Sequence, residues 1–147
     1  MIRLLLAVVL ASALLAASLP AVDDARRERT VARMDRAVDR LRDAAAAIRT
    51  DDPARDPSLA ARRVVRVRLT SRSWTTAGVD AFRIDGRGPD RPPLVTCRLR
   101  GGRSISRRVD APIETPDPVV LRERGVHRLA LRFLLRGDRP VVVLRRG

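Results

Sequence analysis

The chain has 147 residues, enough for one modest domain or for a membrane anchor followed by a smaller domain. Its 31 basic residues are all arginine, and 17 acidic residues leave a net charge of +14. A single histidine and a single cysteine exclude an internal disulfide framework and do not supply the ligands of a typical zinc or copper site. We therefore expect neither a metal nor a cofactor.

The first segment, residues 1–22, reads "MIRLLLAVVLASALLAASLPAV" and carries Arg3 as its only charged side chain. Residues 4–22 would form about 28 Å of helix, close to the roughly 30 Å of a bilayer's hydrocarbon core. Two interpretations follow: a transmembrane anchor that contacts lipid through residues 4–22, or a cleaved secretory signal with a small-residue site at Ala16–Ser18. The length of the uncharged run favours the anchor.

The orientation of this anchor is ambiguous in the sequence. Arg26, Arg27, Arg29 and Arg33 follow the apolar run and only Arg3 precedes it, which by the positive-inside rule places the C-terminal part in the cytoplasm. A short basic start followed by an early apolar run is, on the other hand, typical of an export signal. We expect a single-pass protein of the cell membrane with an extracytoplasmic C-terminal domain, and the arginine count keeps the opposite orientation open.

Residues 23–49 contain no glycine or proline and predict an amphipathic helix. Residues 50–61 form a linker, since Pro53 and Pro57 prevent the helix from continuing. The apolar positions of the helix form a narrow stripe of the kind that packs on another helix or on a sheet. We expect it to cover the protein's own C-terminal sheet. The stripe, called the helix seam below, consists of Val31, Met34, Val38, Leu41, Ala45 and Ile48.

From residue 62 the apolar residues recur at every second position instead of at helical spacing, which predicts β-strands. Strands are expected at 62–70, 79–84, 119–123, 126–136 and 140–146, with a loop at 110–118. Residues 94–109 predict a hairpin turning about Gly101–Gly102. The sequence thus indicates an α+β protein in which a long N-terminal helix precedes a basic domain, residues 62–147, built on an antiparallel sheet of about six strands.

The alternation of apolar side chains also predicts the register of this hairpin. A two-residue loop would place Ile105 on the face opposite Leu99. A three-residue loop puts Val95, Cys97 and Leu99 on the same face as Ile105 and Val109. We therefore expect the three-residue loop.

The basic charge is concentrated in residues 62–147, which hold 21 arginines and eight acidic residues, against ten and nine in residues 1–61. Such an imbalance indicates an anionic partner, for example lipid headgroups, acidic glycans or an acidic protein. Nucleic acid is not expected, because the aromatic residues are few and we place Phe82 and Phe133 in the core, with Trp74 there or at the membrane edge. The candidate anion-binding residues are Arg66, Arg68, Arg128, Arg132 and Arg136.

No catalytic constellation is visible in the sequence. His127 lies on the apolar face of a predicted strand, and Cys97 is expected to be a small buried hydrophobe. The hydroxyl residues around Trp74 have no second histidine to activate them. We therefore expect that the protein is not an enzyme.

The layout of "MIRLLLAVVLASALLAASLPAVDDARRERTVARMDRAVDRL" resembles the N-terminus of a type IV pilin or pseudopilin. It is also similar to uncharacterised archaeal membrane proteins associated with pilus gene clusters. The resemblance implies an apolar helix that continues into an amphipathic one packed on an antiparallel sheet. It further implies a non-catalytic structural or assembly component of a pilus-like or secretion apparatus. The alternative is an exported or anchored anion-binding module that uses the arginine-rich β domain.

Overall fold

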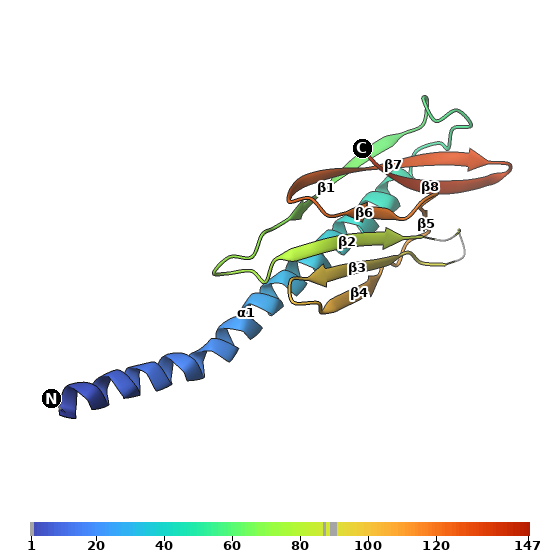
Figure 1. The fold of residues 1–147 in the computed structure, drawn as a ribbon. Helices are drawn as coiled ribbons and strands as arrows, with labels where there is room; N and C mark the ends of the chain where they lie inside the picture. The colour runs from blue at the N-terminus through green and yellow to red at the C-terminus, as the bar shows by residue number, and fades with distance from the viewer. Residues whose placement is uncertain (1, 87, 89–90) are drawn as a thin grey trace.

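The computed structural model describes residues 2–86, 88 and 91–147 and confirms the α+β class (Figure 1). One helix, α1 (Ile2–Ile48), precedes all the strands. The strands are β1 (Arg62–Leu69), β2 (Val79–Asp85), β3 (Leu94–Leu99), β4 (Ser104–Arg108), β5 (Ile113–Glu114), β6 (Val119–Leu121), β7 (Gly125–Arg136) and β8 (Arg139–Arg146).

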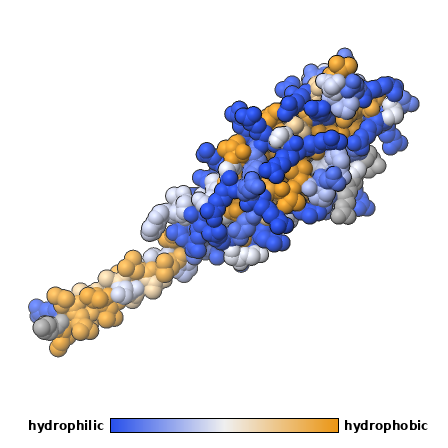
Figure 2. Space-filling view, turned by 45° about the horizontal axis from the view of Figure 1, so that its top comes forward, coloured by the Kyte–Doolittle hydropathy of each residue, from blue (hydrophilic) through white to orange (hydrophobic). Residues whose placement is uncertain are grey.

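Helix α1 joins the predicted anchor and the predicted amphipathic helix in one element of 47 residues, with Pro20 inside it. Its first part is long and apolar enough to cross a membrane, and none of that apolar window is buried against the rest of the protein. Figure 1 shows this part projecting beyond the strands, while the second part lies along them. In the space-filling view of Figure 2 the projecting end is predominantly apolar and the domain is mostly hydrophilic.

The strands of the described residues form two four-stranded sheets. Sheet 1 has the order β1-β7-β8-β5, and sheet 2 has the order β4-β3-β2-β6. All neighbours pair antiparallel except β5 and β8, which are parallel. The sequence analysis expected one sheet of about six strands. Alternation along a strand indicates which face is apolar, but it does not indicate which strands share a sheet.

The β3–β4 hairpin has the register predicted from its apolar pattern. Cys97 lies opposite Ile105, and the N–H of Leu99 donates to the carbonyl oxygen of Arg103 at 2.8 Å, so residues 100–102 form the loop. Gly101 and Gly102 have φ angles of 103° and 86°, a region that favours glycine. The three-residue loop is therefore confirmed.

Strand β5 corrects the prediction that residues 110–118 form only a loop. Ile113 pairs with Val142 of β8, and Glu114 pairs with Val143. Ile113 is 1 % exposed, so burial of one side chain in the core fixes this short parallel pairing. Two residues between proline-containing turns are too few to give a periodic signal in the sequence.

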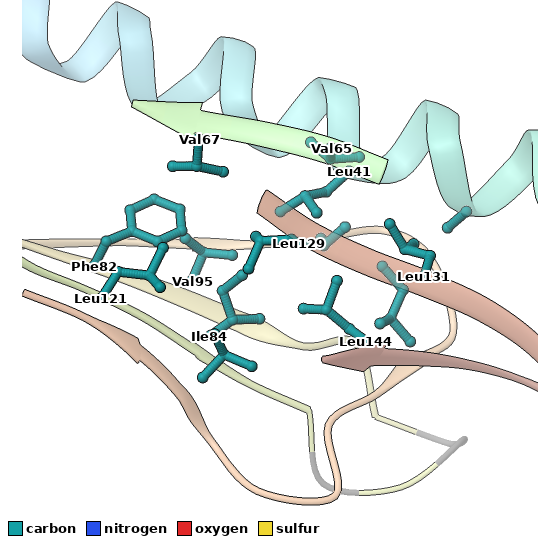
Figure 3. Packing of buried hydrophobic residues seen from close by; sticks show 14 of the residues in the cluster. Leu41, Val65, Val67, Phe82, Ile84, Val95, Leu121, Leu129, Leu131 and Leu144 are labelled. Carbon is teal, nitrogen blue, oxygen red and sulfur yellow. The ribbon is translucent and has the colours of Figure 1, made fainter. Parts of the chain in front are cut away.

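One main hydrophobic core lies between the two sheets and α1 (Figure 3). Leu41 of α1 reaches Val65 of β1 in this view, and side chains of both sheets, among them Ile84 and Leu129, meet below them. A smaller cluster of Leu134, Val141 and Val143 lies on the other face of sheet 1, where Ala60 of the linker packs against it. The core thus fixes the second half of α1 to the strands.

Candidate functional site

Four of the six residues of the helix seam pack inside the molecule. Met34, Leu41, Ala45 and Ile48 are each at most 4 % exposed, and α1 contacts β1, β4 and β7. Val31 and Val38 are only half-buried, because the buried face is rotated slightly from the predicted stripe.

Two residues that sequence reasoning missed complete the buried face of the helix. Thr30 and Ala37 are 3 % and 4 % exposed. They lie four residues before Met34 and Leu41, a spacing that places them on the same face of a helix. This spacing was the available signal, but a small and a polar side chain do not stand out as apolar positions.

The face of sheet 1 that points away from the main core is rich in arginine. Because directly paired residues share a face, Arg66 lies beside Arg128, and Arg62 beside Arg132. The same alternation places further arginines of β1, β7 and β8 on this face. This surface, called the arginine face below, carries Arg62, Arg66, Arg68, Arg128, Arg132, Arg136, Arg139 and Arg145.

The five predicted anion-binding residues divide into two groups on this face. Arg132 donates to the carbonyl oxygen of Pro57 at 2.7 Å, and Arg136 pairs with the Glu114 carboxylate at 3.1 Å. The side chains of Arg66, Arg68 and Arg128 make no hydrogen bond or ion pair with any residue in the described part of the chain. Among the five predicted residues, these three cations are therefore available to an external anion. Arg62, which the sequence analysis did not select, lies on the same face.

A cavity of about 380 Å³ lies between α1 and the strands, next to the edge of the arginine face. Its lining includes the apolar side chains of Met34, Val67 and Phe82, together with the thiol of Cys97. Four arginines line it as well, three from α1 and one from β1. They are Arg33, Arg36, Arg40 and Arg68. An apolar hollow with cationic side chains matches an anion that carries an apolar portion.

The single histidine and the single cysteine, His127 and Cys97, are both buried. The Nε2–H of His127 donates to the carbonyl oxygen of Glu123 at 2.6 Å, and the ring is 8 % exposed. Burial raises the pKa of the Cys97 thiol to about 11, so that the thiol stays protonated at neutral pH. In the described ranges, no group of three or more His, Cys, Asp or Glu side chains is placed to hold a metal ion.

The three aromatic residues have two different environments. Phe82 and Phe133 are 2 % and 6 % exposed and belong to the core, as predicted. Trp74 is 88 % exposed, so a core position for it is wrong. The residue lies instead in the β1–β2 loop, beside the part of α1 that follows the apolar run.

Fold and surface together define an α+β protein with a candidate N-terminal membrane span and a basic two-sheet domain. The chain belongs to the family described as a domain of unknown function, DUF7311, whose model matches residues 1–147. Comparison with curated proteins and with solved structures finds no significant match.

Proposed function

We propose that this protein is a non-catalytic, single-pass membrane protein that acts as a structural or assembly component of a pilus-like or secretion apparatus. The observation that carries the proposal is that one unbroken helix, α1, has two different parts. The bare half, Ile2–Val22, is apolar and no part of the domain covers it, whereas the packed half, Thr30–Ile48, is buried on one side against the strands. This arrangement resembles that of pilins, in which an apolar helix continues into an amphipathic one packed on an antiparallel sheet.

The bare half of α1 needs an apolar environment on all sides. Eleven large apolar side chains between Ile2 and Val22 are at least 40 % exposed. Full burial of one such side chain is worth about 1.5–3 kcal/mol. Their combined transfer into lipid, or into a bundle of similar helices, is therefore a large driving force for membrane insertion and assembly.

The proposed location is the cell membrane, with the two-sheet domain outside the cytoplasm. Carbonate extraction of membranes tests the anchor, and protease treatment of intact cells tests the side on which the domain lies. We expect a carbonate-resistant full-length chain whose domain is digested in intact cells. A chain that begins beyond Ser18 and is found in the medium would overturn the anchor, and a fully protected domain would reverse the orientation.

Cross-linking within the membrane tests the assembly role. Single cysteines at positions 7–17 of α1, introduced one at a time into a Cys97→Ala background, scan all sides of the bare half. We expect disulfide or bismaleimide products along one side of the helix, and none from the Cys97→Ala parent. A scan without products at any position would contradict an assembly function while leaving the anchor intact.

Anion binding by the arginine face is the second candidate function. The side-by-side placement of Arg66 and Arg128 supports it, because like charges directly opposite on a sheet destabilise it unless an anion lies between them. Heparin affinity provides the measurement. The double variant Arg66→Gln, Arg128→Gln should weaken binding and reduce its salt dependence.

A matched control for this experiment removes two arginines outside the arginine face. The double variant Arg108→Gln, Arg122→Gln removes the same charge at the end of β4 and just after β6, where both side chains are exposed and form no ion pair with a described residue. We expect the control to lose less affinity than the variant of the arginine face. Equal losses from both variants would mean that net charge, rather than this face, determines binding.

A further inference from the structure

The loop between β1 and β2 presents Trp74 at a tight tip. Ser73 and Thr76 exchange two backbone hydrogen bonds, with N···O distances of 3.0 Å and 3.4 Å, so Trp74 and Thr75 form the turn between them. The indole is 88 % exposed. A tight turn that displays a tryptophan to solvent offers a large apolar surface to a partner.

Contacts with α1 hold this loop just beyond the apolar run. The Arg26 Nε–H donates to the carbonyl oxygen of Trp74 at 2.9 Å, and the Arg26 guanidinium lies 6.0 Å from the centre of the indole ring. Arg72 lies 3.8 Å from the carboxylate of Asp23. The N–H of Ala77 donates to the buried Thr30 hydroxyl at 3.2 Å. The loop is therefore fixed along α1 between residues 23 and 30.

The backbone at Gly78 adds a further constraint on the loop. Gly78 has a φ of 78°, and a Cβ at this position would lie 2.7 Å from the backbone nitrogen of Arg72. The loop closes tightly on itself at its base, which only glycine permits. The closed backbone of the loop thus determines the position of Trp74.

The position of the loop along α1 matches the headgroup layer of a bilayer. Arg26 follows Val22, the last residue of the apolar run, by four positions, which is about 6 Å of helix. The headgroup layer is about 5–8 Å thick on each side of the hydrocarbon core. Tryptophan is enriched at this depth in membrane proteins. Figure 1 shows the β1–β2 loop at the end of the domain from which the bare half of α1 projects.

Arginine side chains also gather beside the β1–β2 loop. A shallow hollow between α1, the β1–β2 loop and the β3–β4 loop is lined by four arginines, one aspartate and Ala77. The arginines are Arg26, Arg27, Arg72 and Arg100, and the acid is Asp23. Each of the four has a carboxylate partner: Arg26 and Arg72 pair with Asp23, Arg27 pairs with Asp24, and Arg100 pairs with Asp80 at 3.5 Å. Four guanidinium groups against three carboxylates leave a net positive charge, which favours the phosphates of lipid headgroups.

We propose that the β1–β2 loop is a second membrane contact, in which Trp74 inserts into the headgroup layer and Arg72 and Arg100 bind lipid phosphates. This inference rests on the proposed membrane anchoring and adds the way in which the domain rests on the bilayer. Two contacts, α1 and the loop, fix the tilt of the domain relative to the membrane, which one helix alone does not.

The fluorescence of Trp74 reports this contact directly, because the chain contains one tryptophan and no tyrosine. The full chain is reconstituted into phosphatidylcholine–phosphatidylglycerol nanodiscs that carry nitroxide-labelled lipid. We expect blue-shifted emission that is quenched more strongly by a nitroxide on the headgroup than by one near the end of the acyl chain. Red emission without quenching by either label would overturn the proposal.

A matched control moves the tryptophan to the opposite end of β1. Leu59 lies in the α1–β1 linker and is 79 % exposed. The variant Trp74→Phe, Leu59→Trp should show red emission and no quenching by labelled lipid. Quenching of this control to the same extent as the natural protein would mean that contact with lipid is not specific to the loop.

Two further outcomes separate this proposal from the membrane anchor. A chain that does not co-elute with the discs overturns both the anchor and the loop contact. A chain that co-elutes while Trp74 stays unquenched overturns the loop contact alone. The double variant Arg72→Gln, Arg100→Gln should remain in the discs but lose part of the headgroup quenching, and unchanged quenching would remove these arginines from the contact.

Discussion

The two halves of α1 have the same backbone and opposite surroundings. Between Ile2 and Val22 the helix is apolar on every side, and no side of it is covered by the domain. Between Thr30 and Ile48 it is apolar on one side, which is buried against the strands. The comparison teaches that the side-chain pattern selects the environment of a helix: an apolar circumference requires an apolar solvent, and a single stripe requires one packing surface.

Truncation of a core side chain in the packed half gives the largest expected effect. Leu41 is 1 % exposed, and Leu41→Ala should lower the free energy of unfolding of the domain by about 2–5 kcal/mol. Urea denaturation of the full chain in detergent, followed by circular dichroism, measures this change. The same truncation in the bare half, Leu10→Ala, should leave the domain transition unchanged, and equal shifts would mean that the two halves are not energetically distinct.

A charge in the bare half should have a different consequence. Leu10→Arg places a guanidinium near the middle of the apolar run and should cost about 2.5–3.5 kcal/mol in membrane insertion. The fraction of the chain that resists carbonate extraction should fall, whereas the urea transition of the domain should not move. A variant that resists extraction to the same extent as the natural protein would mean that residue 10 does not lie near the middle of the hydrocarbon core.

The core that the packed half covers should become less stable at high pH. Burial raises the pKa of Cys97 from 9.0 to about 11, so the folded state holds its proton more tightly than the unfolded state. The stabilisation is complete below pH 9 and is lost as the pH rises toward 11, by about 2–3 kcal/mol in total. Urea denaturation across this range should show the loss.

The composition of the chain makes the change of stability between pH 9 and 11 easy to assign. The chain has no lysine and no tyrosine, the two other side chains whose ordinary pKa values lie near 10, so a loss of stability between pH 9 and 11 is assigned to Cys97. The Cys97→Ala variant should have a flat profile. A variant that retains the slope would assign the loss of stability to another cause.

The solvent side of the packed half should contribute least. Arg42 is next to Leu41 in the chain, but it is exposed and pairs with Asp39 and Asp43 at 3.6 Å and 3.4 Å. Exposed ion pairs of this kind contribute little, so Arg42→Gln should change the unfolding free energy by less than about 0.5 kcal/mol. A loss comparable to that of Leu41→Ala would contradict the one-sided packing of this half.

The sequence predicted those features that depend on local pattern. The helix, all the strands except β5, and the hairpin register followed from apolar spacing, because each is set by neighbours along the chain. The division into two sheets was not predictable in this way, since it depends on pairings such as β1 with β7 that join residues far apart in sequence.

The candidate site was predicted in part for the same reason. Alternation identified the outward arginines, but the hydrogen bond of Arg132 to Pro57 and the ion pair of Arg136 with Glu114 depend on how the linker and β5 fold over the strands. The exposure of Trp74 was also hidden, because an aromatic residue in a loop has no periodic neighbours that indicate its surroundings.

The strands at the borders of the two sheets have a consequence for self-association. Helix α1 contacts β1 and β4, which border the sheets on one side, and the opposite borders in the described residues are β5 and β6, with two and three residues. An unprotected long border strand recruits strands from other molecules and leads to aggregation. Strand β5 pairs only with Val142 and Val143 of the eight-residue β8, so the rest of that edge of β8 has no strand partner in the described residues. This part of sheet 1 is where a strand from another molecule would find free backbone groups.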